Sequence, residues 1–164
     1  MRCLSFFADN EFYAVDVTLV QKVVRKMVVT PIPTAPVAVV GIANLKGRVV
    51  TLLDLAYLLG REKKRTDISA YIVDAVVFKS LSGGANQTGL VIDKPGNLID
   101  ITDDAISLPP LTTDSEDSYC ISGIAEVEDR LYRIISIDSI VEKFKYTGEK
   151  AANTMQVEGD ESNG

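Results

Sequence analysis

The sequence contains no histidine and no tryptophan, and its two cysteines, Cys3 and Cys120, form no CxxC motif. Without histidine, the chain lacks a Ser-His-Asp or Cys-His catalytic couple, a phosphohistidine carrier and a histidine-ligated zinc site. Two isolated cysteines are typical of buried thiols in a reducing compartment, and a single disulfide between them is the alternative. We therefore expect no catalytic, cofactor-binding or metal-binding residues, and a protein that is not an enzyme.

Membrane-spanning segments and nucleic-acid-binding patches are also missing. Residues 27–45 form an uncharged stretch, but Pro31, Pro33 and Pro36 exclude a membrane helix there. The apolar run near the N-terminus is too short for a signal peptide, which favours a cytoplasmic protein. The net charge of −6 argues against binding to nucleic acid, and the basic segment 61–65 is interpreted as a solvated linker.

The remaining composition is that of a globular β protein. Hydrophobic residues make up 46% of the chain, and valine plus isoleucine outnumber alanine plus leucine by 33 to 27, which favours strands. Turn-forming residues between apolar runs predict hairpins centred on residues 8–11 and on Gly47. A short helix is expected to end at Gly60, and a closing helix is expected near residues 138–145. Three aspartates are expected to cap backbone N–H groups, not to act as acids or bases: Asp16, Asp54 and Asp93.

Two segments of the chain are similar to each other. Residues 41–55, GIANLKGRVVTLLDL, match residues 123–137, GIAEVEDRLYRIISI, at a shift of 82 residues. Pro33 matches Pro110 at a shift of 77, and an acidic loop accounts for the difference. Chance similarity between two hairpins is one interpretation. The better one is an internal duplication in which each half has about five short strands, a number that suits a small closed barrel.

Several segments resemble a known family, the CheW-like domains. Residues 7–17, FADNEFYAVDV, are similar to the opening hairpin of that family. The strongest match is residues 30–55, which resemble the family pattern of two prolines followed by G-v-i-N-L-R-G and v-i-D-L. The resemblance extends over about residues 3–145. This chain departs from the pattern in two places, with Lys46 in place of the usual arginine and Thr51 in place of the usual proline.

The resemblance implies a mainly β fold of two SH3-like five-stranded β-barrels packed together, with a few short helices including one near the C-terminus. It implies a single CheW-like domain over residues 3–146. We place the first barrel at about residues 3–66 and the second at about 67–146. Residues 147–164 are predicted to be a disordered acidic tail, because they carry four acidic side chains and few large apolar ones.

The resemblance also implies a function, that of a stand-alone, non-catalytic adaptor in bacterial chemotaxis. The implied partners are the cytoplasmic tips of chemoreceptors and the CheW-like regulatory domain of the histidine kinase CheA. The protein would be cytoplasmic and recruited to membrane-associated receptor arrays, without nucleic acid and without insertion into the membrane. Two alternatives are an adaptor in a kinase array outside chemotaxis and a small β-barrel ligand sensor.

Six residues form the candidate partner-binding site: Val20, Val40, Gly41, Asn44, Lys46 and Arg48. Several also have a purely structural interpretation. A lysine at a hairpin tip can be a solvated turn residue, Asn44 can bond nearby backbone and set the turn, and Gly41 is primarily a backbone requirement. Lys46 keeps the charge of the family's arginine but loses its planar fork for bidentate contacts. The apolar run 37–45 exceeds what one barrel must bury, so part of it is predicted to face a partner.

Overall fold

The structure, a computed structural model, describes residues 1–60, 71–80, 86–108 and 120–143. It is mainly β, as predicted. The described strands are β1 Arg2–Ala8, β2 Glu11–Asp16, β3 Val20–Val29, β4 Val39–Leu45, β5 Arg48–Asp54, β6 Tyr71–Phe78, β7 Gln87–Ile92, β8 Lys94–Asp100, β9 Ile106–Ser107, β10 Ile121–Val127 and β11 Arg130–Ile135. The described helical segments are η1 Val17–Leu19, α1 Leu55–Leu58, η2 Asp103–Ala105 and a helix over residues 137–143.

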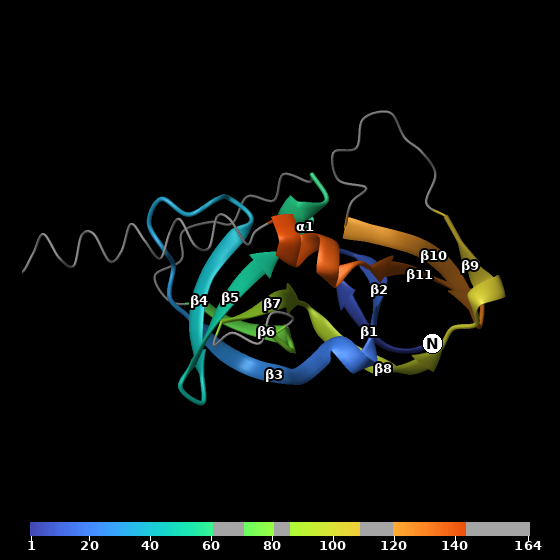
Figure 1. Cartoon of the computed structure of the whole chain (residues 1–164), viewed down its shortest axis with the longest axis horizontal. Helices are drawn as coiled ribbons and strands as arrows, with labels where there is room; N and C mark the ends of the chain where they lie inside the picture. The colour runs from blue at the N-terminus through green and yellow to red at the C-terminus, as the bar shows by residue number, and fades with distance from the viewer. Residues whose placement is uncertain (61–70, 81–85, 109–119, 144–164) are drawn as a thin grey trace, which may run out of the picture.

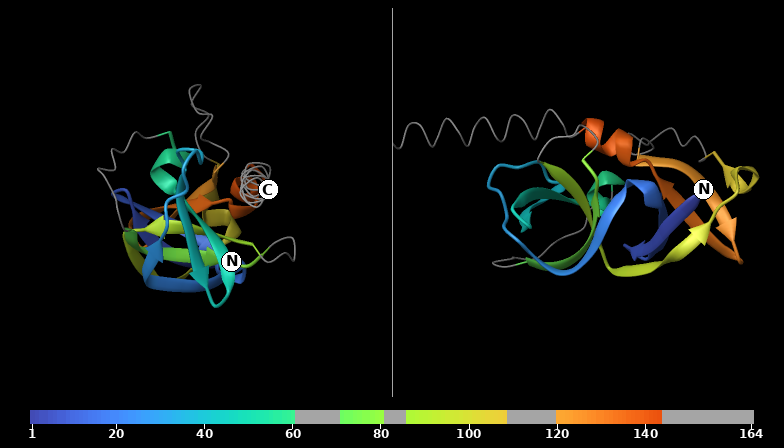
Figure 2. Two further views of the ribbon diagram at one scale, coloured as in Figure 1. Left: turned by 90° about the vertical axis from the view of Figure 1, so that its left-hand side faces the viewer. Right: turned by 60° about the horizontal axis from the view of Figure 1, so that its bottom comes forward.

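The strands form two curled sheets that lie side by side (Figure 1; Figure 2). One sheet has five strands in the order β3-β6-β7-β5-β4, and we call it the five-stranded barrel. The other has six strands in the order β8-β1-β2-β11-β10-β9, and we call it the six-stranded barrel. Thr30 pairs with Ile42 and so brings the end of β3 back to β4. The expected pair of SH3-like barrels is confirmed, with the two-residue β9 as an additional strand.

The two barrels exchange their hairpins, which the sequence interpretation missed. The hairpin β1–β2 pairs with β8 and β11 from the second half of the chain. The hairpin β6–β7 pairs with β3 and β5 from the first half. The expected barrel boundaries, 3–66 and 67–146, are therefore wrong as a division into barrels. The two halves are equivalent in sequence pattern, so the pattern did not reveal which copy each hairpin joins.

The register of the strands confirms the internal duplication. Gly41 pairs with Leu52 in the β4–β5 hairpin, and Gly123 pairs with Ile134 in the β10–β11 hairpin. Both pairs are related by the shift of 82 residues, and in both hairpins the register shifts immediately before the glycine. A parallel strand flanks each hairpin, β7 beside β5 and β2 beside β11. The segments 41–55 and 123–137 are thus equivalent units in separate barrels, as predicted.

Each barrel has its own small core, and a larger core lies between them. The shared core takes Phe6 and Tyr13 from the six-stranded barrel and Leu53 and Phe78 from the five-stranded barrel. The helix α1 and the helix at 137–143 add buried side chains to it, including Leu55 and Ile140. Figure 1 shows these two helices on the same side of the molecule, above the junction of the barrels. Burial of these large side chains fixes the two barrels against each other.

Two of the three aspartates cap short helices as predicted. The carboxylate of Asp16 accepts the Thr18 N–H at 3.0 Å where the chain leaves one barrel for the other. Asp54 accepts the Ala56 N–H at 3.0 Å and begins α1. Asp93 has a different role, because its carboxylate accepts the N–H of Asp9 in the β1–β2 turn at 2.9 Å.

The remaining sequence predictions have mixed outcomes. Cys3 and Cys120 are both free and buried, as predicted. The helix at 137–143 confirms the closing helix over its described part. The basic segment 61–65 and the acidic tail 147–164 lie outside the described residues, so the predictions for them stay predictions.

Candidate functional site

The tip of the β4–β5 hairpin is a two-residue turn with a left-handed backbone. Lys46 has φ of 50° and Gly47 has φ of 82°, the combination that a type I′ hairpin turn requires. The side-chain oxygen of Asn44 accepts the N–H of Gly47 at 2.9 Å. The structural interpretation of Asn44 as a turn-setting residue is therefore confirmed.

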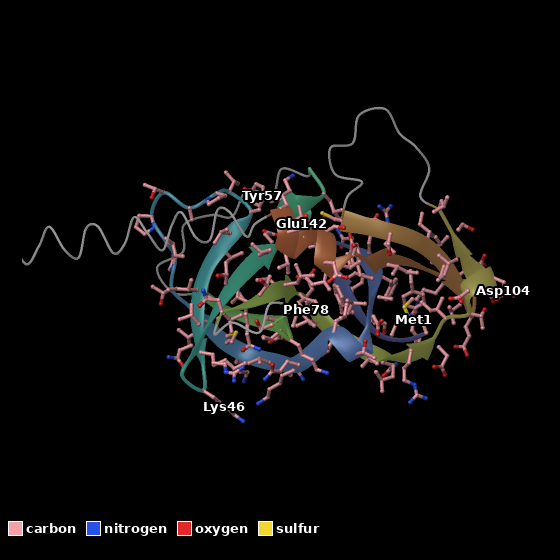
Figure 3. All side chains as sticks on the ribbon, viewed as in Figure 1. Met1, Lys46, Tyr57, Phe78, Asp104 and Glu142 are labelled. Carbon is pink, nitrogen blue, oxygen red and sulfur yellow. The ribbon has the colours of Figure 1, made fainter. Side chains whose placement is uncertain are left out.

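The hairpin tip projects two cations from the body of the barrel. Lys46 and Arg48 are both exposed, and Figure 3 shows Lys46 at the far end of the hairpin, pointing away from the protein. Within the described residues, no carboxylate lies within ion-pair distance of Lys46. A partner contact with this lysine would therefore not first have to break an ion pair among those residues.

An open groove lies beside this hairpin, where β3 and β4 face each other. Its volume is about 590 Å³. Apart from the bridge between Thr30 and Ile42, β3 and β4 are not paired with each other. They are the two edge strands of the five-stranded sheet, so the groove lies where that barrel stays open. It is lined by Val24, Lys26, Met27, Val28, Thr30, Ile42, Ala43, Asn44, Leu45 and Val49. Seven of these ten are apolar, so the groove presents mainly apolar side chains.

Exposed apolar side chains continue the groove on both sides. Val28 is 64% exposed and pairs across the strands with Ile72, which is 67% exposed. On the opposite side, Val49 is 43% exposed and pairs with Asn44. Isolated apolar residues on a surface are ordinary, but a cross-strand pair next to an apolar groove forms a continuous patch. This face of the barrel is therefore the strongest candidate for a partner contact.

The structure brings five of the six predicted site residues together on the β4–β5 hairpin. Val20 lies apart, at the start of β3, and packs half-buried against the shared core. Val40 is half-buried against the core of the five-stranded barrel. Gly41 is buried, and a Cβ added to it would overlap the carbonyl oxygen of Thr30. Gly41 thus serves the close approach of Thr30 and not a direct partner contact. In the predicted partner-facing run, Val37 is 70% exposed.

Sequence reasoning missed Lys26 and Val28 on the β3 side of the groove, and Ile72 of β6 beside them. One signal was available in the sequence. In the run Met27-Val28-Val29, strand alternation buries the first and third residues and turns Val28 outward, so an exposed valine could have been predicted. Its pairing with Ile72 depends on which hairpin β3 joins, and that was not predictable.

Other kinds of site find no support in the described part of the chain. No group of three or more acidic or cysteine side chains there is arranged to bind a metal ion. Among the described helices, none is both long and apolar enough to cross a membrane. The thiol of Cys3 is buried, and burial together with the nearby Asp16 carboxylate raises its pKa to about 11, so it is a poor nucleophile at neutral pH.

Two fused small barrels with an open apolar groove and a cationic hairpin tip define a class of protein-binding modules. Similarity to known proteins specifies the class further. The family model of the CheW-like domain matches residues 2–145, and the chain belongs to this family.

Relatives of similar length are chemotaxis proteins. The chain is 28% identical over 146 residues to chemotaxis protein CheW of Thermotoga maritima, covering 85% of this chain and 87% of that protein. It is 25% identical over 138 residues to chemotaxis protein CheW of Rhizobium meliloti, covering 84% of each. The crystal structure of the scaffolding protein TtCheW from Thermoanaerobacter tengcongensis superposes with a TM-score of 0.68 at 27% identity, covering 82% of this chain and 88% of that one.

Proposed function

We propose that this chain is a non-catalytic adaptor of chemotaxis signal transduction that couples the cytoplasmic tips of chemoreceptors to a CheA-type histidine kinase. In this role it is a cytoplasmic protein that is recruited to membrane-associated receptor arrays. The kinase would contribute its own CheW-like regulatory domain to the contact.

The observation that carries the proposal is the family match over residues 2–145, together with the likeness in structure to TtCheW, which is a scaffolding protein. The protein's surface supports it independently. An open groove of apolar side chains and a tip with two exposed cations suit a protein contact, whereas a small-molecule pocket would enclose its ligand. We assign the contact to the β4–β5 hairpin and its groove, with Asn44 setting the turn and Lys46 and Arg48 as the contacting cations.

The other predicted residues, Val20, Val40 and Gly41, have different roles in this proposal. Val20 lies apart from the hairpin, half-exposed at the start of β3, and we assign it to a second, separate partner surface. Val40 and Gly41 support the hairpin from inside the barrel. An adaptor needs two separate partner surfaces, because it has to bind both partners at the same time.

Reconstitution tests the proposal directly. Receptor-containing membranes, the purified kinase and this chain are combined, and autophosphorylation of the kinase is measured with and without the chain. We expect the chain to sediment with the membranes and to raise kinase activity only when receptor is present. The proposal is wrong if the chain binds neither the kinase regulatory domain nor a receptor-tip fragment. A pull-down from the native cytosol would then identify the actual partners.

A further inference from the structure

Strand β3 contains a bulge next to the groove. Val24 pairs with Ala75 and Met27 with Val73, so Arg25 and Lys26 together face the single residue Asp74. Such a bulge bends its strand and changes the direction of the side chains in it. The directions in which the side chains of Arg25 and Lys26 point are therefore set by the bulge and not by regular strand alternation.

The six-stranded barrel has an equivalent bulge with uncharged residues. Leu4 pairs with Leu98 and Phe6 with Pro95, so Gly96 and Asn97 together face Ser5. The hydroxyl oxygen of Ser5 accepts the backbone N–H of Asn97 at 2.9 Å. The bulge thus belongs to the duplicated fold, whereas its charged residues occur only in the barrel that has the groove.

Both carboxylate oxygens of Asp74 contact the bulge in β3. Oδ1 accepts the backbone N–H of Lys26 at 3.0 Å, and Oδ2 lies 3.7 Å from Nε of Arg25. Lys26 has φ of 55°, a left-handed conformation that a lysine rarely takes and that the hydrogen bond to Asp74 stabilises. The side chain of Asp74 is only 20% exposed, but that of Arg25 is 73% exposed, so solvent screens the ion pair and the hydrogen bond to Lys26 is the main contact that holds the bulge.

The bulge places one positive charge at the groove. Of the ten described residues that line the groove, Lys26 is the only charged one. Around it lie Val24, Met27 and Val28 of the same strand, with Leu45 and Val49 also in the lining. A lone cation among apolar side chains favours a ligand that offers apolar groups and a single carboxylate.

We infer that Asp74 is a positioning residue that, through the bulge in β3, directs Lys26 into the groove, and that the groove selects a partner segment with apolar side chains and one carboxylate. This inference rests on the proposed function, and it specifies the chemistry of the partner at that site. Arg25 belongs to the same bulge but is not part of the groove lining. Comparing variants of Arg25 and Lys26 therefore shows whether binding depends on any positive charge in the bulge or only on the one that lines the groove.

The experiment measures binding of the full chain to two purified probes, the kinase regulatory domain and a receptor-tip fragment, at low and high salt. The variants are Lys26→Asn, Lys26→Glu, Asp74→Ala, Asp74→Asn and the double variant Lys26→Asn with Asp74→Ala. Asparagine tolerates the left-handed backbone and so removes the charge while keeping the bulge. Arg25→Gln is the matched control, because it removes the same charge one residue away from the groove. Melting temperatures show that each variant folds.

We expect Lys26→Asn to weaken binding to one of the two probes by about three- to fivefold at low salt, with a smaller loss at high salt. Lys26→Glu should weaken it further, and Arg25→Gln should change it by less than about twofold. Asp74→Ala should weaken binding as Lys26→Asn does, while Asp74→Asn, which keeps an oxygen acceptor, should bind nearly as wild type. Because Asp74 acts through Lys26, the double variant should bind no worse than either single variant.

Two results overturn the inference while leaving the proposed function intact. One is wild-type affinity of both Lys26 variants for both probes. The other is an additive loss in the double variant, which would mean that Asp74 affects binding independently of Lys26. If the wild-type chain binds neither probe, the proposed function itself fails. The two failures are therefore distinguishable.

Discussion

Glu128 occupies at the tip of the β10–β11 hairpin the position that Lys46 occupies at the tip of the β4–β5 hairpin. The two residues have nearly the same backbone conformation, with φ of 51° and 50°. The next residues, Asp129 and Gly47, also have positive φ. Duplication has therefore kept the turn and reversed the charge. A partner that recognises the cationic tip by charge would be repelled by the equivalent tip of the other barrel.

Reversing the charge of Lys46 should cost binding without costing stability. An exposed turn residue changes the free energy of unfolding by less than about 0.5 kcal/mol, whereas loss of a partly desolvated charge contact costs about 2 kcal/mol or more. We expect Lys46→Glu to melt normally and to lose about thirtyfold in affinity for one partner, or to lose receptor-dependent kinase activation. Lys46→Arg should match or exceed wild type, because its fork has additional donors.

The control for this series is Lys94→Glu, an exposed lysine on β8 of the six-stranded barrel. It makes the same change in net charge far along the chain from the hairpin. Equal losses for Lys94→Glu and Lys46→Glu would indicate a general electrostatic effect. Wild-type coupling by Lys46→Glu would mean that the tip is only a turn and that the partner surface lies elsewhere.

The two glycines of the β4–β5 hairpin should respond differently to alanine. A methyl group at position 41 would overlap the Thr30 carbonyl oxygen, so Gly41→Ala should lower the free energy of unfolding by about 2–3 kcal/mol. At position 47 the added carbon would have no described atom within 4 Å, so Gly47→Ala should cost only the left-handed backbone penalty, about 1 kcal/mol. Urea denaturation of both variants measures the difference. A larger loss for Gly47→Ala would contradict the packing assigned to Thr30.

The buried thiol of Cys3 should make stability depend on pH in the alkaline range. Burial raises the pKa of Cys3 from 9.0 to about 11, so the folded protein retains the thiol proton that the unfolded chain releases. The stability due to this thiol is complete below pH 9 and is lost between pH 9 and pH 11. Wild type should therefore lose more stability over this range than Cys3→Ala. Parallel losses in the two proteins would show that other groups dominate.

Cutting the chain between the described residues 60 and 71 tests the exchange of hairpins. Each fragment would then lack one hairpin of each barrel, so neither fragment alone can form either sheet as described. We expect the separate fragments to be largely unfolded by circular dichroism and to fold together when mixed at equal concentration. A well-dispersed NMR spectrum from one fragment alone would show that its hairpin can close on its own half.

How far the sequence predicted this structure depends on the range of the interactions. The turns at residues 8–11 and 46–47 follow from a few neighbouring residues with known backbone preferences, and they were predicted correctly. The cap at Asp54 is equally local. The exchange of hairpins was missed because no residue within β1–β2 or β6–β7 specifies from which half of the chain its partner strands come.

The candidate site was predicted only in part for the same reason. Asn44 and Lys46 belong to a motif that is continuous in sequence, and their place on the hairpin could be predicted. The other side of the groove depends on Asp74, which contacts Lys26 from 48 positions further along the chain. Strand alternation turns Val28 outward, but its pairing with Ile72 depends on which hairpin joins β3. No local pattern contains that information.

The exchanged hairpins have a mechanical consequence. Because each barrel is completed by strands from the other half of the chain, the described strands leave no single hinge at which the barrels could swing apart. The chain crosses between the barrels twice, from β2 into β3 and from β7 into β8. A force that pulls on the five-stranded barrel would therefore act on β3 and β7, which are held in that barrel by their pairing with β6 and β5. Separating the barrels would stretch both of these chain connections at once and would expose the core that the barrels share. A displacement of one barrel is therefore resisted by two covalent connections and by the shared core, so the other barrel has to follow it.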